Sequence, residues 1–520
     1  MIEAGPRPTP PRSIRWWPGI LLLALAAIAV IWVRAQSDWP FQKRNLTTYQ
    51  ILIVAAIALV LWWTFVSRAA NRLRLGVTFG LVGVAMVGAA LFKVRGVSGD
   101  MLLILEFRWA QRDLPAATPA PAASSTLQSI NASTASAFPQ FYGPNRDGVL
   151  PGPKLATDWI THPPQVLWRQ PVGTGWSGFA IVDGMALTQE QRGDEECVVA
   201  RELATGRELW RHADRARYQT TVAGEGPRAT PTVVSNRVFT LGATGLLNCL
   251  DLATGKRIWS HDVVSESGGR VPQWGATSSP LLVNDLVVVH GGEGGSHSLL
   301  AFQADDGALV WKGGTSSSYS TPACATLTGV PQVLAFNDGS ISGHDPRSGA
   351  TLWQRAWGNG NVVCAMPLVV NSNRVLFSSG YGVGAELLEL AQNTNGTLSA
   401  RRVWKSIRMK AKFAHLFIRD GCVFGLDDGM FACVSLEDGS LQWKEGRHGH
   451  GQGLLVGDFY LLMAESGELV LLHPTPDAPN ELARFRVFDS KTWNPIALSG
   501  DLLLVRNDRE AVCLRLLLAR

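Results

Sequence analysis

The densest group of potentially reactive side chains is the run Gly-Arg-His-Gly-His-Gly-Gln at residues 446–452. Glycines beside the two imidazoles and the guanidinium allow tight backbone turns, and imidazole both titrates near neutral pH and binds metals. A metal ion would need a third ligand, for which His415 is the only nearby candidate. The competing interpretation is that these histidines hydrogen-bond backbone carbonyls at a junction of the fold. We favour this interpretation, so the sequence predicts no metal site. No nucleophile-elbow motif accompanies the histidines, so it predicts no catalytic group either.

Cysteine and overall charge point to no further chemistry. The seven cysteines are scattered without C-x-x-C spacing, which argues against a zinc site and a disulfide framework. Cys422 and Cys433 would face each other if the turn of their hairpin centres on Asp427 and Asp428, and could then bridge in an oxidising compartment. A net charge of +5 without a basic stripe gives no support to a nucleic-acid partner.

The elements that must position the histidine run belong to a repeat, in which a tryptophan follows a glycine by four residues. The copies pair Gly206 with Trp210, Gly255 with Trp259, Gly307 with Trp311, Gly349 with Trp353, and Gly439 with Trp443. Trp168 and Trp404 extend the series, Phe485 takes the next aromatic place, and successive aromatics stand 39 to 52 residues apart. Such periods are typical of four-stranded propeller blades, and β-branched and aromatic runs between Pro, Asn, Asp and Gly turns indicate an all-β domain.

Counting these blades predicts a closed ring of eight. Seven complete blades run from Trp176 to about Phe485, and only three strands remain after Asn494. Residues 165–169, which contain Trp168, supply the missing outer strand. The N- and C-terminal strands therefore share the last blade, which removes an exposed sheet edge.

Three apolar runs precede this domain, at residues 17–33, 49–67 and 75–92. Each is close to the length of about 20 residues that crosses a bilayer, and none contains an ionisable residue of the kind that marks a transport path. The sequence therefore predicts an N-terminal tail at 1–16, a membrane anchor at 17–93, and the propeller at 138–520. Between them, residues 94–137 form a juxtamembrane segment and an Ala/Pro/Ser-rich linker. Six basic residues flank the spans on one side and five on the other, so charge does not decide the orientation.

The motif Leu-Ala-Thr-Gly-x-x-x-Trp, at residues 203–210 and 252–259, resembles the tryptophan-docking repeat of the PQQ-repeat, or quinoprotein-like, β-propeller superfamily. The sequence Phe-Pro-Gln-Phe-Tyr-Gly-Pro-Asn-Arg-Asp-Gly at 138–148 resembles the start of its BamB-like branch. The resemblance, over about residues 138–516, implies that each docking tryptophan pins an outer strand to a neighbouring blade. These structural tryptophans are Trp168, Trp210, Trp259, Trp311, Trp353, Trp404 and Trp443.

This superfamily contains both quinoprotein dehydrogenases and non-catalytic scaffolds such as BamB-type assembly factors, so the resemblance leaves the activity open. The dehydrogenase pattern includes two adjacent cysteines against the quinone, with carboxylate and amide ligands for calcium. This chain has no adjacent cysteines, and Glu190, Glu225 and Glu293 stand in no matching context. We therefore expect a cofactor-free binding or scaffold module outside the cytoplasm, in the periplasm. The alternative is a PQQ- and calcium-dependent oxidoreductase that passes electrons to membrane quinones.

The candidate binding site follows from propeller geometry, because every link from an outer strand to the next inner strand emerges on one face, around the channel. We call it the channel face. A ring of aromatic and polar side chains there is typical of a pocket for a small molecule or a peptide. We expect Lys412, Arg447, His448 and His450 to remain solvated on it. The predicted ligand-binding residues are Arg228, Trp274, Tyr319, Lys412, His415, Arg447, His448, His450, Gln452, Trp493 and Asn494.

Overall fold

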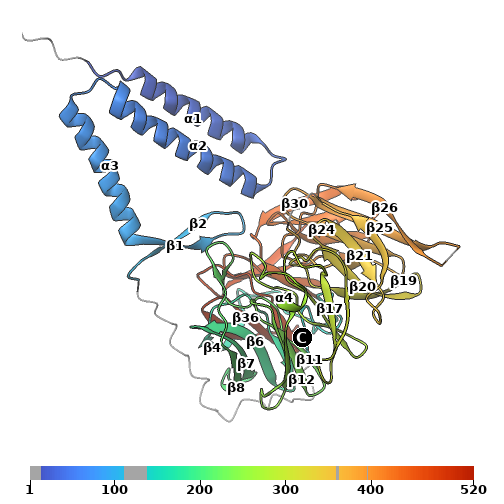
Figure 1. Ribbon diagram of the computed structural model, residues 1–520. Coiled ribbons are helices and arrows are strands. Elements are labelled where there is room, and N and C mark those ends of the chain that lie inside the picture. Colours follow the sequence, from blue (N-terminus) through green and yellow to red (C-terminus); the bar gives the residue numbers. More distant parts are fainter. Residues whose placement is uncertain (1–12, 111–136, 359–361, 395, 520) are drawn as a thin grey trace, which may run out of the picture. The chain divides into compact units, whose positions relative to one another are not determined.

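A computed structural model describes residues 13–110, 137–358, 362–394 and 396–519. The chain divides into two units, residues 1–112 and 113–520, and each is described by itself. Figure 1 shows the helical unit in blue and the strand-rich unit in green to red. Most of the predicted linker lies outside the described residues.

The first unit contains three helices that are long and apolar enough to cross a membrane. They are α1 (Trp17–Ala35), α2 (Phe41–Leu61), which continues as the π-helical turn η1 (Trp62–Val66), and α3 (Asn71–Leu91). The second helix starts at Phe41 rather than at Tyr49, so its first turns include Lys43 and Arg44. A two-stranded hairpin, β1 (Phe92–Val97) and β2 (Leu103–Phe107), follows α3 directly. The sequence had not predicted this hairpin.

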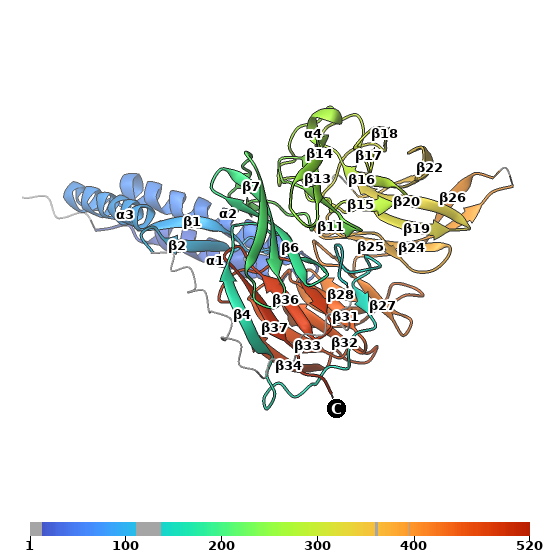
Figure 2. The same ribbon diagram turned by 90° about the horizontal axis from the view of Figure 1, so that it is seen from below.

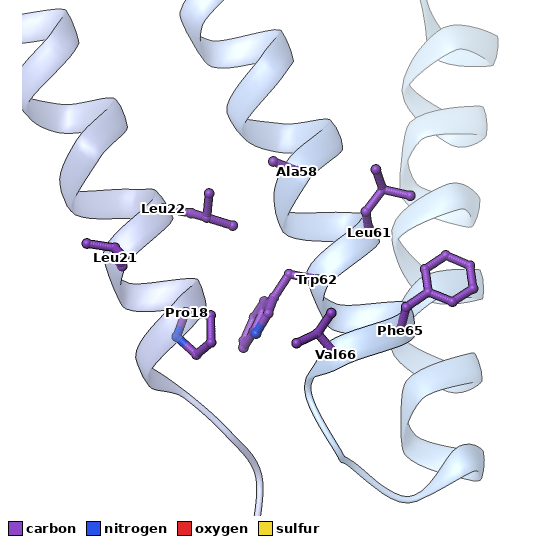
Figure 3. A pocket seen from close by; sticks show the side chains of 8 residues that line it. All are labelled: Pro18, Leu21, Leu22, Ala58, Leu61, Trp62, Phe65 and Val66. Carbon is purple, nitrogen blue, oxygen red and sulfur yellow. The ribbon is translucent and has the colours of Figure 1, made fainter.

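Helices α1 and α2 approach closely where Trp62 meets Gly19. A Cβ atom on Gly19 would lie 2.6 Å from the Trp62 ring, so only glycine leaves room for the indole. Beside this contact lies a groove of about 570 Å³, which Figure 3 shows with the Trp62 ring directed toward Pro18. Its lining is entirely apolar apart from the indole nitrogen: Pro18, Leu21, Leu22, Ala58, Leu61, Trp62, Phe65 and Val66.

The second unit is an eight-bladed propeller in which each blade is an antiparallel sheet. Central strands are the most deeply buried, as in β16, where every residue is buried, whereas the outer strand β14 is mostly exposed or half-buried. Blades 1 and 2 are β5 (Ala180–Val182), β6 (Met185–Arg192), β7 (Glu195–Glu202), β8 (Glu208–Asp214) and β11 (Thr232–Val234), β12 (Arg237–Leu241), β13 (Leu246–Asp251), β14 (Arg257–Asp262). Blades 3 and 4 are β15 (Leu281–Val283), β16 (Leu286–His290), β17 (Leu299–Gln303), β18 (Leu309–Gly313) and β19 (Ala323–Leu327), β20 (Val330–Asn337), β21 (Ser340–His344), β22 (Thr351–Ala356).

The ring continues through four more sheets. Blades 5 and 6 are β23 (Leu368–Val369), β24 (Arg374–Ser379), β25 (Gly384–Gln392), β26 (Leu398–Ser406) and β27 (Phe417–Arg419), β28 (Cys422–Asp427), β29 (Met430–Ser435), β30 (Leu441–Arg447). Blade 7 is β31 (Gln452–Val456), β32 (Phe459–Met463), β33 (Glu468–Leu472) and β34 (Glu481–Arg486), with β3 (Val149–Leu150) added at its inner edge. Two short elements lie in links: the hairpin β9 (Gln219–Thr220) with β10 (Gly224–Glu225), and helix α4 (Val263–Glu266).

Blade 8 confirms the predicted sharing of the first and last strands. Its strands are β35 (Ala497–Ser499), β36 (Leu502–Arg506), β37 (Glu510–Arg515) and β4 (Gln165–Pro171). In Figure 2 teal β4 lies against red β37. Trp168 pairs with Cys513 across these two strands, so the ring is closed by hydrogen bonds between the two ends of the domain.

The repeated tryptophans join consecutive blades. Trp168 Nε1 donates to Leu203 O at 2.8 Å, and Trp210 Nε1 donates to Leu252 O at 2.9 Å. The Trp210 ring also covers Gly255, whose added Cβ would lie 2.4 Å from it. Trp353 is different, because its Nε1 donates to Gln332 Oε1 within the same blade. The remaining bonds to the next blade are Trp259 to Ala304 O, Trp311 to Pro346 O, Trp404 to Leu436 O and Trp443 to Thr475 O.

In blade 6 the strand register is not the one that would place Cys422 opposite Cys433 for a disulfide. Asp427 pairs with Met430, so the turn centres on Asp428 and Gly429. Cys422 therefore faces Ser435 rather than Cys433, and both thiols are unbridged.

Candidate functional site

Two kinds of segment build the channel face, and sequence reasoning recognised only one. An inner strand runs away from this face and the second strand returns to it, so the turn between the second and third strands also emerges there. These turns bring Tyr381 from blade 5, Asp428 from blade 6 and Glu465 from blade 7 to the face. The short Gly-containing breaks between the second and third apolar runs could have revealed them.

Three aromatic rings and a lysine form a cluster on the channel face. The centroid of the Trp493 ring lies 5.0 Å from that of Trp176 and 5.3 Å from that of Phe413. Lys491 Nζ lies 3.7 Å from the Trp493 centroid and 4.7 Å from that of Trp176, within the range of a cation–π interaction. Trp493 Nε1 donates to Glu465 Oε1 at 2.9 Å, which fixes the ring. We call Trp176, Phe413, Lys491 and Trp493 the aromatic cluster.

A polar group adjoins the aromatic cluster through Phe413. The His450 ring centroid lies 5.5 Å from that of Phe413, and His450 Nε2 lies 3.4 Å from Lys412 Nζ. The Lys412 ammonium is also 3.7 Å from Asp428 Oδ1 and 5.3 Å from the Tyr381 ring centroid. The channel face therefore combines aromatic surface with cationic and anionic groups over blades 5 to 8.

The expected solvation of the histidine run is wrong. His448 is 4% exposed, and Lys412 and His450 are each 2% exposed. Burial lowers the pKa of His448 from 6.5 to about 4, because desolvation disfavours the charged imidazole. The backbone N–H of His448 donates to Gly429 O at 2.9 Å, which ties the run to the turn of blade 6. Arg447, at the end of β30, is exposed.

Residues 138–150 occupy the channel itself, and we call this segment the channel plug. Phe138 forms a bridge with Ile181, and Val233 N donates to Pro139 O at 2.8 Å. On the return path, β3 runs parallel to β31, with Leu150 opposite Val456. Since Ile181, Val233 and Val456 lie in the middle or at the end of inner strands, both arms of the channel plug lie toward the face opposite the channel face.

The tip of the channel plug reaches the beginnings of the inner strands. Arg146 donates to Ser279 O at 3.1 Å and to Pro280 O at 3.0 Å. Its burial lowers the guanidinium pKa from 12.5 to about 10. The motif at 138–148 had indicated a family resemblance, but nothing in its residue types indicated that it enters the channel.

The channel plug accounts for two predicted ligand-binding residues. Tyr142 Oη donates to Gln452 Oε1 at 2.5 Å, and Gln452 Nε2 donates to Phe413 O at 2.8 Å. The His415 ring stacks on Tyr142 with centroids 4.7 Å apart and is 5% exposed. Burial lowers the pKa of His415 to about 4. Both side chains therefore contact the channel plug.

Arg228 and Asn494 form contacts within the propeller. The Arg228 guanidinium donates to Ala223 O and Gly224 O and lies 4.4 Å from the Tyr218 ring centroid. Asn494 Nδ2 donates to two backbone carbonyls, at 2.9 and 3.0 Å. Through these hydrogen bonds both side chains hold the backbone around the channel face in place.

Trp274 and Tyr319 remain on the channel face, with ring centroids 5.3 Å apart. Tyr319 also lines a polar cavity of about 210 Å³ between the links around blades 3 to 5. Arg270 and the Gln273 N–H hold the pKa of the Glu293 carboxyl in this cavity below its usual value. The polar groups that line the cavity are Gln273, Glu293, Ser317, Ser318, Tyr319 and Asp338.

The three histidines do not converge on one point. Across the described part of the propeller alone, no three His, Cys, Asp or Glu side chains lie in a metal-ligand arrangement. His415 contacts the channel plug, whereas His450 lies beside Lys412.

The closed ring of four-stranded blades joined by docking tryptophans defines an eight-bladed propeller of the PQQ-repeat type. Residues 165–445 match the family model described as outer membrane protein assembly factor BamB. Since this match spans more than half of the chain, the protein belongs to that family. No curated protein sequence matches the chain.

Solved structures share the architecture at low sequence identity. BamB from Moraxella catarrhalis is 15% identical, with 68% of this chain and 97% of that chain covered and a TM-score of 0.48. The quinohemoprotein alcohol dehydrogenase from Comamonas testosteroni is 12% identical, with 73% and 80% covered and a TM-score of 0.53. At 12% identity, the likeness to the alcohol dehydrogenase shows the fold and not the activity.

The resemblance to dehydrogenases implies a quinone and calcium site, and the chain lacks the adjacent cysteines of that pattern. All seven cysteines are unbridged and none is adjacent to another in sequence. The three acids that the sequence offered near the channel mouth are each paired with an arginine. The pairs are Glu190 with Arg192, Glu225 with Arg217, and Glu293 with Arg270.

Proposed function

We propose that the protein is a membrane-anchored binding or scaffold propeller whose channel face, outside the cytoplasm, recognises a protein or a small ligand. The aromatic cluster is the observation that carries this proposal. Tryptophan supplies large contact area at low entropic cost and dominates the energetics of many interfaces. The half-buried Lys491 adds a charge that can select a partner.

The channel plug supports recognition on the face rather than along the channel axis. Its Tyr142 and Arg146 side chains bond to residues at the beginnings of inner strands, so it fills the channel nearly to the level of the links. A ligand that approaches the channel face would meet the half-buried side chains of the aromatic cluster, Phe413, Lys491 and Trp493, and the polar cavity. Small ligands suit the cavity, and protein partners suit the wider aromatic surface.

Partner capture from the native membrane tests the channel face directly. Tagged full-length protein is cross-linked in cells and purified, and bound proteins are quantified for wild type, Trp493→Ala and Lys491→Ala. Lys256→Ala is the matched control, because Lys256 is exposed in the turn between β13 and β14, on the opposite face. Loss of a hot-spot residue costs about 2 kcal/mol or more, roughly a thirtyfold loss of affinity. Equal capture by Trp493→Ala and Lys256→Ala would contradict the proposal.

Location and redox activity have separate tests. Alkaline phosphatase fused after Arg520 is expected to be active, and an inactive phosphatase with a fluorescent cytoplasmic reporter would reverse the topology.

Titration of the purified protein with PQQ and calcium is expected to give no stoichiometric absorbance change. Tight binding with substrate-dependent dye reduction would establish the oxidoreductase instead.

A further inference from the structure

The β1–β2 hairpin has an exposed face without a polar side chain. Phe92 pairs with Phe107 and Val94 pairs with Leu105, so these four side chains share one face. They are 43 to 58% exposed. Leu103, two residues before Leu105 and therefore on the same face, is 54% exposed. The intervening residues Lys93, Arg95, Ile104 and Glu106 are less exposed. In a hairpin that lies in water, the apolar face is covered and the polar face is exposed. The β1–β2 hairpin shows the opposite distribution of exposure.

Aromatic contacts extend the apolar face beyond the strands. The Phe107 ring centroid lies 5.9 Å from that of Phe92 and 5.5 Å from that of Trp109. Trp109 is 62% exposed. Tryptophan at the end of a membrane span favours the layer between lipid tails and headgroups.

The hairpin is continuous with a membrane-spanning helix. Helix α3 ends at Leu91 and β1 begins at Phe92. Arg108, just after β2, donates to Ala89 O and Ala90 O in the last turn of α3. These bonds satisfy carbonyls that a helix end otherwise leaves unpaired, and they hold the base of the hairpin at the end of the span.

We infer that the β1–β2 hairpin is an interfacial element whose apolar face, Phe92, Val94, Leu103, Leu105 and Phe107, lies in the lipid surface. The occupant of this face is the bilayer, because the hairpin starts where α3 leaves the membrane. Lys93 and Glu106, which form an ion pair at 3.4 Å, lie on the other face, so the charged side chains of these strands are kept away from the lipid. The linker to the propeller would thus start at the membrane surface.

Nitroxide accessibility distinguishes lipid, water and protein around this face. Cys324 and Cys364, which are not buried, are replaced by serine, and the full-length protein is labelled at Val94→Cys or at Lys93→Cys. These neighbours have comparable exposure, 46% for Val94 and 39% for the Lys93 side chain, on opposite faces. Vesicles of phosphatidylcholine and phosphatidylglycerol hold the protein.

The label at position 94 is expected to be relaxed more strongly by oxygen than by a water-soluble nickel chelate, and the label at position 93 is expected to show the reverse. Equal access of the chelate to both labels would place the face in water. Protection of the label at position 94 from both reagents would show that protein covers it. Either result overturns the inference.

A second measurement needs no introduced cysteine. Brominated phosphatidylcholine is expected to quench wild-type fluorescence more than that of Trp109→Phe, because Trp109 contributes an exposed indole next to the apolar face. Identical quenching of the two proteins would also overturn the inference.

Discussion

The contribution of the channel plug to stability can be measured by replacing Arg146 with leucine. Arg146 is 7% exposed, and its bonds to Ser279 O and Pro280 O are 3.1 and 3.0 Å long. Leucine would leave both carbonyls unpaired, at a cost of about 1 to 3 kcal/mol each. Removing a buried guanidinium recovers part of this cost, so we expect a net loss of about 2 to 4 kcal/mol.

The assay is chemical denaturation of the full-length protein, followed by tryptophan fluorescence. Arg401→Leu is the control, because the Arg401 side chain is 70% exposed on an outer strand, where a substitution typically changes stability by less than about 0.5 kcal/mol. Limited proteolysis provides a second readout, since a loosened channel plug should be cleaved near residues 138–150. Equal stability and equal protection of the two variants would refute the role given to the channel plug.

Three further predictions concern the propeller. Trp259→Ala, which removes a buried docking ring, should cost about 3 to 5 kcal/mol, whereas Arg447→Ala should cost less than about 0.5 kcal/mol in the same denaturation assay. Deleting residues 160–170 removes most of β4 and should lower the thermal midpoint and solubility; an unchanged midpoint would contradict the shared blade. His415 and His448 have folded pKa values of about 4 against 6.5 unfolded, so the unfolded state binds protons first and stability should fall between about pH 6.5 and pH 4. His415→Phe should make that fall shallower, and an unchanged pH dependence would contradict the burial of this imidazole.

Periodicity predicted the fold because the repeat is visible in residue types. The Gly-x-x-x-Trp spacing marks a turn and a ring that must dock on it, so the blades could be counted and the strand with Trp168 could be placed beside the one with Cys513. The β1–β2 hairpin escaped notice because its exposed side chains are apolar, and the run from Leu75 to Phe92 read as one continuous span.

The candidate site was harder to predict because exposure depends on contacts distant in sequence. His448 and His450 have the composition of a solvated loop, but both are buried. His415 lies in a link as expected and Gln452 at the start of β31, yet both contact Tyr142, some 270 or more residues earlier in the chain. The pattern of neighbouring residues in the sequence does not indicate a contact between residues so far apart. Trp493 lies in the link between β34 and β35, as the blade count predicted.

The channel face is tested most directly by a photoreactive amino acid at position 491 of the full-length protein in living cells. Position 256, an exposed lysine on the opposite face, serves as the control. Irradiation is expected to give a specific cross-linked partner from position 491 that disappears when Trp493→Ala is added, and none from position 256. The same products from both positions, or products from position 491 that survive Trp493→Ala, would contradict recognition by the aromatic cluster.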